Sequence, residues 1–239
     1  MKECCFFISA GKESILCNYI LNNKEKILND FDVFIIFYDE DESYFEKLKT
    51  ISKKAEKNKG TKFSLLKKHY HAFKILDYKY VFVFDDDCKL INGEFVDLYH
   101  LIKKYNLSLI SPSHDGGGKI SHPIMVCKKG NHILRYTNFI EMNFPVFETQ
   151  SLEKFLQVYN FEVLGFGIDW WYLNILESNK NLNCAIYDGV KVYNPKNTDK
   201  SNCKIDQNYS RNFLTDQWIK LQAEKNILTW NHENLKFLY

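Results

Sequence analysis

The chain has 239 residues, of which 45% are hydrophobic and 26% charged, with 10 Gly and 4 Pro. This composition suits one generous domain with a full core and excludes collagen-like, low-complexity and wholly disordered chains. The 32 basic and 30 acidic residues leave a net charge of +2, too balanced for a dedicated nucleic-acid binder. Only Arg135 and Arg211 are arginines, so the chain has little capacity for bidentate recognition of phosphate.

The seven cysteines predict neither a disulfide framework nor a structural zinc site. Their number is odd, and none of them forms a Cys-x-x-Cys. No apolar run approaches the roughly 20 residues that a helix needs to cross a bilayer. We therefore expect a protein of the reducing cytoplasm.

Apolar runs and helical patterns alternate along the chain, which indicates an α/β fold with a mainly parallel sheet covered on both faces by helices. Lysine-rich Lys47–Lys59 predicts a solvated helix or loop, 195–208 is polar, and Trp230–Tyr239 is an aromatic tail. The pattern predicts strands at Cys4–Ser9, Val33–Phe37, Tyr80–Phe84 and Leu107–Ser111, and helices at Ile15–Leu28, Lys62–Leu76, Phe95–Tyr105 and Tyr209–Asn226.

Three acids, Asp85, Asp86 and Asp87, directly follow the most apolar strand. In such sheets ligands collect at the carboxyl ends of the strands. Three adjacent carboxylates repel one another unless a cation or a proton relieves them. In an extended segment Asp85 and Asp87 point to one side and could share one Mg(II) or Mn(II) ion, whereas Asp86 points away or meets a sugar. The alternative is a turn with exposed acids.

A substrate diphosphate beside these acids would need further polar contacts. Asp86 is one candidate for such a contact. Lys62, on the helix before the acids, is another, although a solvated face is the commoner fate of Lys62, Lys67 and Lys68.

The segment Gly165–Trp171 combines two glycines, an acid and two tryptophans. Gly165 and Gly167 permit a tight turn and close approach to a ligand. Asp169 would follow at a helix N-terminus, where a carboxylate is favoured. Trp170 and Trp171 offer faces that could stack on a sugar ring. The alternative is a capping aspartate with core tryptophans.

Two further groups of polar residues are weaker signals. Leu109–Ser111 leads into His114 and Asp115, which could contact a donor sugar or acceptor hydroxyls, and then into three glycines that could equally form a plain loop. Glu141 precedes the apolar segment that ends at Phe147.

Five segments come in an order and spacing that resembles a known family: 78–87, 110–115, 141–147, 165–172 and 185–194. They look like GT-A-fold glycosyltransferase-like proteins catalogued as a domain of unknown function. The resemblance covers roughly residues 3–196, and the run from Gly165 to Tyr172 is its most specific piece.

The resemblance implies a GT-A (Rossmann-like) domain over 1–196, and we expect 197–239 to add a C-terminal helix and the aromatic tail on the same domain. It also implies that Asp85 and Asp87 bind the metal of a metal–nucleotide-sugar and that Asp169 is the candidate base. Ala10, Gly11, Lys12 and Asp39 lie where GT-A enzymes hold the nucleotide base and ribose.

One departure from the family pattern matters: the pattern has a histidine where this chain has Asn194, and GT-A enzymes often use such a histidine as a third metal ligand. An amide oxygen is an acceptable but weaker ligand for Mg(II) or Mn(II). Asn194 therefore predicts a looser metal site, one completed by Tyr193 or water, or an inactive member.

We predict a metal-dependent glycosyltransferase of polysaccharide biosynthesis that uses a UDP-sugar and Mn(II) or Mg(II). Its acceptor would be a glycan or glycolipid, with peripheral contact at the inner membrane face as a further hypothesis; the sequence assigns no oligomeric state. Inversion and retention at the anomeric carbon both occur on this fold, so the role of Asp169 as base is conditional on inversion.

Two other classes stay open. A degenerate nucleotide- or sugar-binding module is favoured by Asn194. A metal-dependent phosphotransferase of the haloacid-dehalogenase type is disfavoured, because the acids follow about the third strand and Asp188 lacks an adjacent acid.

Overall fold

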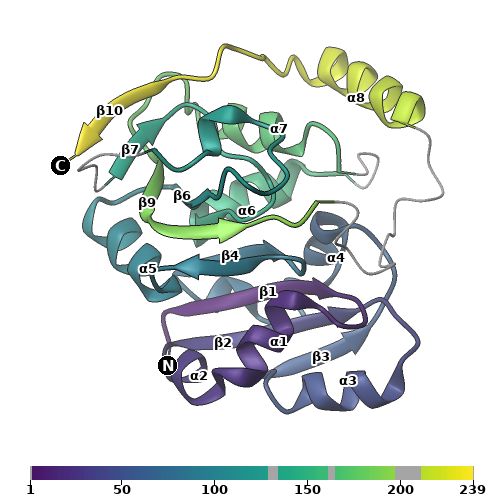
Figure 1. Cartoon of the computed structure of the whole chain (residues 1–239). Coiled ribbons are helices and arrows are strands. Elements are labelled where there is room, and N and C mark those ends of the chain that lie inside the picture. The colour runs from purple at the N-terminus through teal and green to yellow at the C-terminus, as the bar shows by residue number, and fades with distance from the viewer. Residues whose placement is uncertain (1, 129–133, 161–164, 197–210, 239) are drawn as a thin grey trace.

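The computed structural model describes residues 2–128, 134–160, 165–196 and 211–238, and it folds them around one mixed sheet (Figure 1). The strands are β1 (Cys4–Ala10), β2 (Phe31–Phe37), β3 (Lys54–Lys57), β4 (Tyr80–Asp85), β5 (Lys89–Asn92), β6 (Leu109–His114), β7 (Leu134–Thr137), β8 (Val146–Glu148), β9 (Cys184–Tyr193) and β10 (Asn234–Leu238). The α-helices are α1 (Ile15–Asn22), α2 (Lys24–Asp30), α3 (Glu42–Lys49), α4 (Lys62–His69), α5 (Phe95–Lys104), α6 (Thr149–Val158), α7 (Ile168–Ile175) and α8 (Arg211–Lys225), with short 3-10 helices η1 (Ile75–Asp77) and η2 (Pro123–Met125).

The strand order in the described chain is β10-β7-β9-β6-β8-β4-β1-β2-β3, with β5 paired to β9. Parallel pairs join β3 to β2, β2 to β1, β1 to β4, and β6 to β9. Strand β8 runs antiparallel between β4 and β6, so these two strands point the same way. The predicted mixed, mainly parallel sheet flanked by helices is confirmed. The carboxyl ends of β1, β2, β4, β6 and β9 therefore meet at one edge.

Each central strand is apolar on both sides because each face of the sheet has its own core. Phe82 and Phe84 pack with α1 and α5 on one face, whereas Val81 and Val83 pack with α4, α6 and α7 on the other (Figure 1). This alternation is the period-two pattern of a strand buried on both faces.

The lysine-rich segment 47–59 differs from its prediction because it contains strand β3 after the end of α3. The strand lies at the edge of the sheet and, within the described residues, pairs with β2 alone. Its residues Lys54 and Lys57 are exposed. Charged side chains on an edge strand discourage pairing with another chain, which explains why a strand here looks like a solvated loop in the sequence.

The helix predicted over 62–76 is shorter than expected, since α4 ends at His69. Lys74 has a φ of 54°, which the right-handed helix cannot contain. Tyr70 and Phe73, which continue the apolar pattern, pack into the same core from a turn.

The C-terminal part of the chain returns to the sheet. Strand β10 pairs antiparallel with β7, and α8 corresponds to the predicted helix 209–226 (Figure 1). Most of the predicted polar segment, together with Cys203 and Tyr239, lies outside the described residues. The six cysteines inside them are all free thiols.

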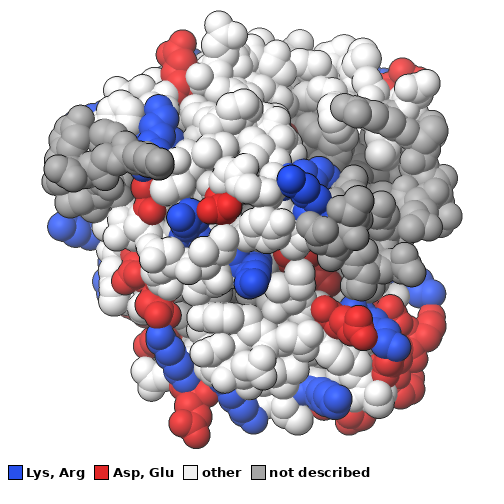
Figure 2. All heavy atoms as spheres, in the orientation of Figure 1, with Lys and Arg blue, Asp and Glu red and all other residues white. Residues whose placement is uncertain are grey.

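Charged residues of both signs lie beside one another on the face that Figure 2 shows. Near α3, for example, Lys59 pairs with Glu40 at 2.8 Å and Lys12 with Asp41 at 3.2 Å. Within the described residues, no helix is both long enough and apolar enough to cross a membrane.

Candidate active site

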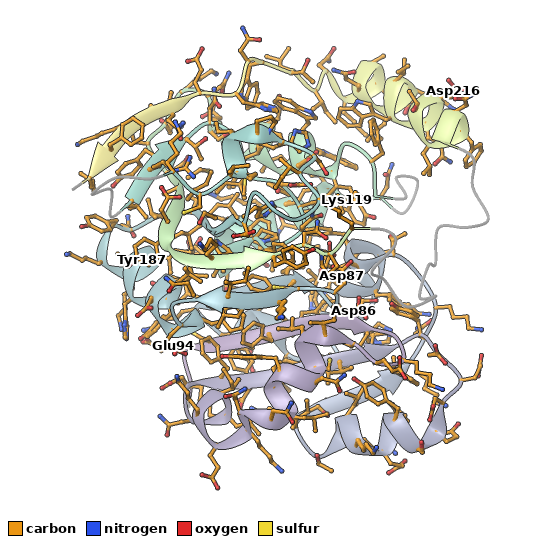
Figure 3. The ribbon with its side chains drawn as sticks, viewed as in Figure 1. Asp86, Asp87, Glu94, Lys119, Tyr187 and Asp216 are labelled. Carbon is orange, nitrogen blue, oxygen red and sulfur yellow. The ribbon has the colours of Figure 1, made fainter. Side chains whose placement is uncertain are left out.

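The acids after β4 lie at the carboxyl edge of the sheet, beside the ends of β1 and β2 (Figure 3). The backbone N–H of Gly11 donates to Asp86 Oδ2 at 2.9 Å, and the Tyr38 hydroxyl donates to the same oxygen at 3.2 Å. Desolvation raises the pKa of Asp86 to about 7 despite these two bonds. Asp86 thus ties three strand ends together, an internal role beside the nucleotide contact expected for it.

The turn after β1, in the predicted nucleotide-binding region, contacts the segment after β2. The carbonyl of buried Ala10 accepts from Tyr38 N at 3.0 Å. The N–H of Lys12 donates to Asp39 Oδ2 at 3.4 Å. Ala10, Gly11, Lys12 and Asp39 therefore lie together at this edge.

Lys62 is a buried cation that holds Asp85. Its Nζ lies 2.7 Å from Asp85 Oδ1 and donates to the carbonyls of Met142 and Asn143 at 2.6 and 3.1 Å. The solvated face considered more common for this lysine is wrong, because its side chain is only 6% exposed. Lys68, on the same helix, is exposed.

Asn194 follows β9 and presents an amide oxygen that the described residues leave unused. Its Oδ1 is buried without a hydrogen-bond partner among them. Its backbone carbonyl accepts from Lys119 N at 2.8 Å. A Cβ on Gly118 would lie 2.6 Å from that carbonyl, so the glycine-rich loop closes tightly on Asn194. A buried acceptor without a donor is costly unless a ligand or a cation satisfies it.

The residues available for a metal ion are oxygen donors. Among the described residues, no group of three or more His, Cys, Asp or Glu could hold a metal by itself. By donor type, the carboxylates of Asp85 and Asp87 and the amide oxygen of Asn194 are nevertheless suited to Mg(II) or Mn(II), because Mg(II) in particular commonly takes one or two protein carboxylates and completes its shell with water and phosphate oxygens.

Asp169 lies in the first turn of α7, after a tight turn at Gly167 whose φ is 82°. Its Oδ1 accepts from Trp170 N at 2.9 Å. Burial raises the pKa of Asp169 to about 6. The Nε2 atom of His122 lies 4.0 Å from Asp169 Oδ2, a contact that no sequence pattern predicts.

His114 and Glu141 are buried side by side, with His114 Nδ1 3.7 Å from Glu141 Oε2. Neither ring nitrogen of His114 nor Glu141 Oε2 has a hydrogen-bond partner in the described chain. Burial lowers the pKa of His114 to about 4. Burial, and then the charges of Asp169 and Asp85, raise the pKa of Glu141 to about 7, against a hydrogen bond from Ser121. Asp85, Glu141 and Asp169 thus belong to one electrostatic cluster.

The other predicted substrate-contacting residues differ in how far they are buried. Trp170 is half-buried, whereas Trp171 is only 3% exposed and packs on Phe155 and Tyr159. This burial is an argument against the sugar-stacking role expected for Trp171. Asp115 accepts from Gly117 N at 2.9 Å and so shapes its own loop.

Sequence reasoning missed several residues at this edge. Tyr38 directly follows β2, so the rule that ligands collect at strand ends could have found it. Nothing in the sequence indicated His122 or Trp218, whose ring occupies the space beside Gly167.

Solved structures share the fold. GalNAc-T7 with UDP, GalNAc and Mn2+ has a TM-score of 0.63 at 10% identity, over 93% of this chain and 48% of that one. Residues 1–349 of S. aureus TarS in complex with UDP-GlcNAc have a TM-score of 0.59 at 12% identity, over 88% of this chain and 62% of that one. The chain thus spans about half to three-fifths of these two proteins. The protein has the GT-A glycosyltransferase fold.

The family can be stated too. The protein-family model described as "Protein of unknown function (DUF707)" matches residues 14–138, more than half of the chain, so the protein belongs to this family. A comparison with curated protein sequences found no match.

Proposed function

We propose that the protein is a metal-dependent glycosyltransferase that moves a sugar from a UDP-sugar to a glycan or glycolipid. One observation carries this proposal: Asp85 and Asp87, the unused Asn194 oxygen and the buried Asp169 come from elements that end or begin at one side of the sheet. The ligands named in the neighbouring structures, UDP-GlcNAc in one and UDP, GalNAc and Mn2+ in the other, support the donor class.

In this proposal Asp85, Asp87 and Asn194 hold Mn(II) or Mg(II), which when bound neutralises charge on the diphosphate. Lys62 keeps Asp85 in place and neutralises part of the acidic cluster. Asp86 fixes Gly11, and this bond orders the turn that would hold the nucleotide together with Ala10, Lys12 and Asp39.

Asp169 is the proposed general base of an inverting transfer. The acceptor oxygen forms a bond to the anomeric carbon while the bond from that carbon to the diphosphate oxygen breaks. The acceptor proton passes to Asp169, and the nucleoside diphosphate leaves with the electron pair. A carboxylate with a pKa near 6 is ionised at neutral pH and basic enough to take part in this transfer.

The remaining predicted contacts belong around the reacting sugars. His114 and Glu141 have unused polar atoms that a sugar hydroxyl would satisfy. Asp115, Gly167 and Trp170 complete the proposed substrate contacts. A cytoplasmic location, with peripheral contact at the inner membrane face, remains part of the proposal.

A second candidate is a degenerate module that binds a nucleotide sugar without turnover. It is favoured by Asn194 and by the ion pair of 2.7 Å in which Lys62 already neutralises Asp85. The two candidates differ in turnover and share donor binding.

The first experiment is calorimetric titration of the full chain with a panel of nucleoside diphosphates, with and without Mn(II). We expect metal-dependent binding of UDP, which Asp87→Asn and Asp85→Asn abolish. The exposed Asp216 on α8 provides a matched control, since Asp216→Asn should bind as the wild type does (Figure 3). UDP binding that survives both site variants unchanged would remove the metal assignment.

Turnover tests the role of Asp169. In assays of UDP-sugar hydrolysis and transfer, Asp169→Asn should lose at least about a hundredfold in kcat and keep its affinity for UDP with Mn(II). The wild-type kcat should rise with pH through about 6, because Asp169 must be ionised to accept the proton. Full activity of the variant would eliminate Asp169 as the base, and binding without any wild-type turnover would favour the degenerate module.

A further inference from the structure

An aromatic wall lies beside Asp169, and the C-terminal segment 230–238 contributes two of its five residues. We define the wall as His122, Phe139, Trp170, Trp230 and His232. The ring of His232 stacks on Phe139 at 3.9 Å and lies 5.3 Å from Trp170, which meets Trp230 edge to face at 5.1 Å. His122 completes the wall, 4.5 Å from Phe139 and 5.1 Å from His232.

The wall is held in place by hydrogen bonds to the C-terminal segment. Trp230 Nε1 donates to the carbonyl of Asn138 at 3.1 Å. The side chain of Asn138 donates to the carbonyl of Asn231 at 2.9 Å and accepts from Glu233 N at 2.8 Å. These bonds fix the backbone on both sides of His232, so the rings are positioned before any ligand arrives.

The wall is partly open to solvent and uncharged. His122, Trp170, Trp230 and His232 are all half-buried, whereas Phe139 beneath them is fully buried. Burial, and then the neighbouring His232, lower the pKa of His122 to about 4, and burial also lowers the pKa of His232. Both imidazoles are therefore neutral at pH 7, with polar ring edges and apolar faces.

The position of the wall relates it to the reaction. His122 connects Asp169 to the rest of the wall, since its Nε2 is 4.0 Å from Asp169 Oδ2 while its ring packs on Phe139. A molecule that presents a hydroxyl to Asp169 would extend over Trp170 and the rings of the C-terminal segment. Neutral aromatic faces suit the apolar face of a sugar ring and offer nothing to an anionic headgroup.

We propose that the aromatic wall is the acceptor subsite and that it binds an uncharged sugar ring, with Trp230 and His232 of the C-terminal segment as specificity-determining residues. This inference rests on the proposed function, because it takes Asp169 as the group that receives the acceptor proton. The part of the acceptor that binds the wall is then a neutral saccharide and not a lipid phosphate.

The four tryptophans make the test direct, because Trp170 and Trp230 belong to the wall whereas Trp171 and Trp218 are buried elsewhere. We would label the full chain with 15N-tryptophan and assign the indole signals with single Trp→Phe variants. The probes are the methyl α- and β-glycosides of glucose, galactose and N-acetylglucosamine, with glycerol 3-phosphate as the anionic comparison. At least one glycoside should shift the Trp170 and Trp230 signals and leave those of Trp171 and Trp218 in place.

Variants then separate binding from folding. Trp230→Ala and His232→Ala should each weaken binding of that glycoside by about tenfold. Phe237→Ala, in the same C-terminal segment but outside the wall, is the control and should bind normally. Unchanged Trp171 and Trp218 signals establish that each variant is folded, and Trp230→Phe, which keeps a ring, should retain most of the affinity.

The outcomes distinguish this inference from the proposed function. If no glycoside shifts the wall signals, or glycerol 3-phosphate shifts them instead, the subsite proposal is overturned, whatever the UDP titration shows. If a glycoside binds at the wall but UDP with Mn(II) does not bind the protein, the sugar subsite stands and the transferase assignment fails.

Discussion

Glu141 is a buried carboxyl whose ionisation its surroundings oppose, and the pH dependence of stability should report this. Burial and nearby carboxylates raise its pKa to about 7, so the folded state binds a proton that the unfolded state has already released. Between pH 5 and pH 8 the folded chain must give up that proton, and this release reduces the free energy of unfolding as pH rises.

Glu141→Gln removes this loss, because glutamine resembles the protonated form. Relative to the wild type, the variant should gain about 2 to 3 kcal/mol of stability between pH 5 and pH 8. Urea unfolding of both proteins at the two pH values measures the difference, and the shifted pKa values of Asp86 and His122, which both proteins share, largely cancel in the comparison. Glu224→Gln, at an exposed position, is measured in the same way as the control substitution. A flat difference for Glu141→Gln would contradict the raised pKa.

At the residue scale the sequence located the acids but not their neighbours. Asp85 and Asp87 were predicted as site residues because they follow a clearly apolar strand. Asp169 was predicted as a site residue because two glycines precede it. The burial of Lys62 was missed because it depends on the carbonyls of Met142 and Asn143, which lie about 80 positions away along the chain. Local spacing carries no information about such a contact.

At the element scale, the start of α7 depends on a contact from α8. Gly167 is in the left-handed region, with a φ of 82°, and a Cβ there would lie 2.2 Å from Cε3 of Trp218. Trp218 is itself buried, so it has little freedom to move away. The glycine is therefore required by both the turn and the packing of the C-terminal helix next to Asp169.

Gly167→Ala should destabilise the protein by at least about 2 kcal/mol more than Gly165→Ala does. Gly165 is the matched control because its φ is also positive, at 107°, but a Cβ there meets no described residue within 4 Å. Both variants carry the backbone strain, and only Gly167→Ala adds the clash. Thermal and urea unfolding measure the stability of the two variants. Equal losses of stability would show that Trp218 and α8 can move away from the new Cβ without a cost in free energy.

The strands with long apolar runs, β1, β2, β4 and β6, were predicted, whereas β3, β5, β7, β8, β9 and β10 were not. The strands from β1 to β6 have strong apolar patterns, except β3 and β5, which are short and carry polar exposed residues. Strand β10 looked like a generic aromatic tail because its residues Leu235 and Lys236 are exposed. These strands exist because a neighbour offers an unpaired edge, which is a property of the whole sheet.

At the scale of the whole molecule, Arg135 connects parts of the chain that are distant in sequence. Its fully buried guanidinium donates to both oxygens of Asp188 at 2.7 and 2.9 Å. It also donates to the carbonyls of Ile124 and Val126 and to Oδ1 of Asn234. One side chain thus joins β7, β9, β10 and the loop that continues from His122.

Replacing Arg135 while Asp188 is kept should lower the free energy of unfolding. Arg135→Met should destabilise the protein by about 3 to 5 kcal/mol, because it leaves the buried carboxylate of Asp188 without its cation. Adding Asp188→Asn removes that charge, so the double variant should be more stable than Arg135→Met alone. The comparison is made by urea unfolding of the two variants and the wild type.

The same variants test whether the C-terminal segment depends on the connection. Because Asn234 follows the wall residues Trp230 and His232 closely, loss of Arg135 should release β10 and disturb the indole signal of Trp230 before that of Trp171. Simultaneous loss of both signals in one transition would mean that the segment and the core unfold as a single unit.

The double variant Arg135→Met with Asp188→Asn tests the source of the lost stability. If it is no more stable than Arg135→Met, the buried charge of Asp188 is not the source of that loss.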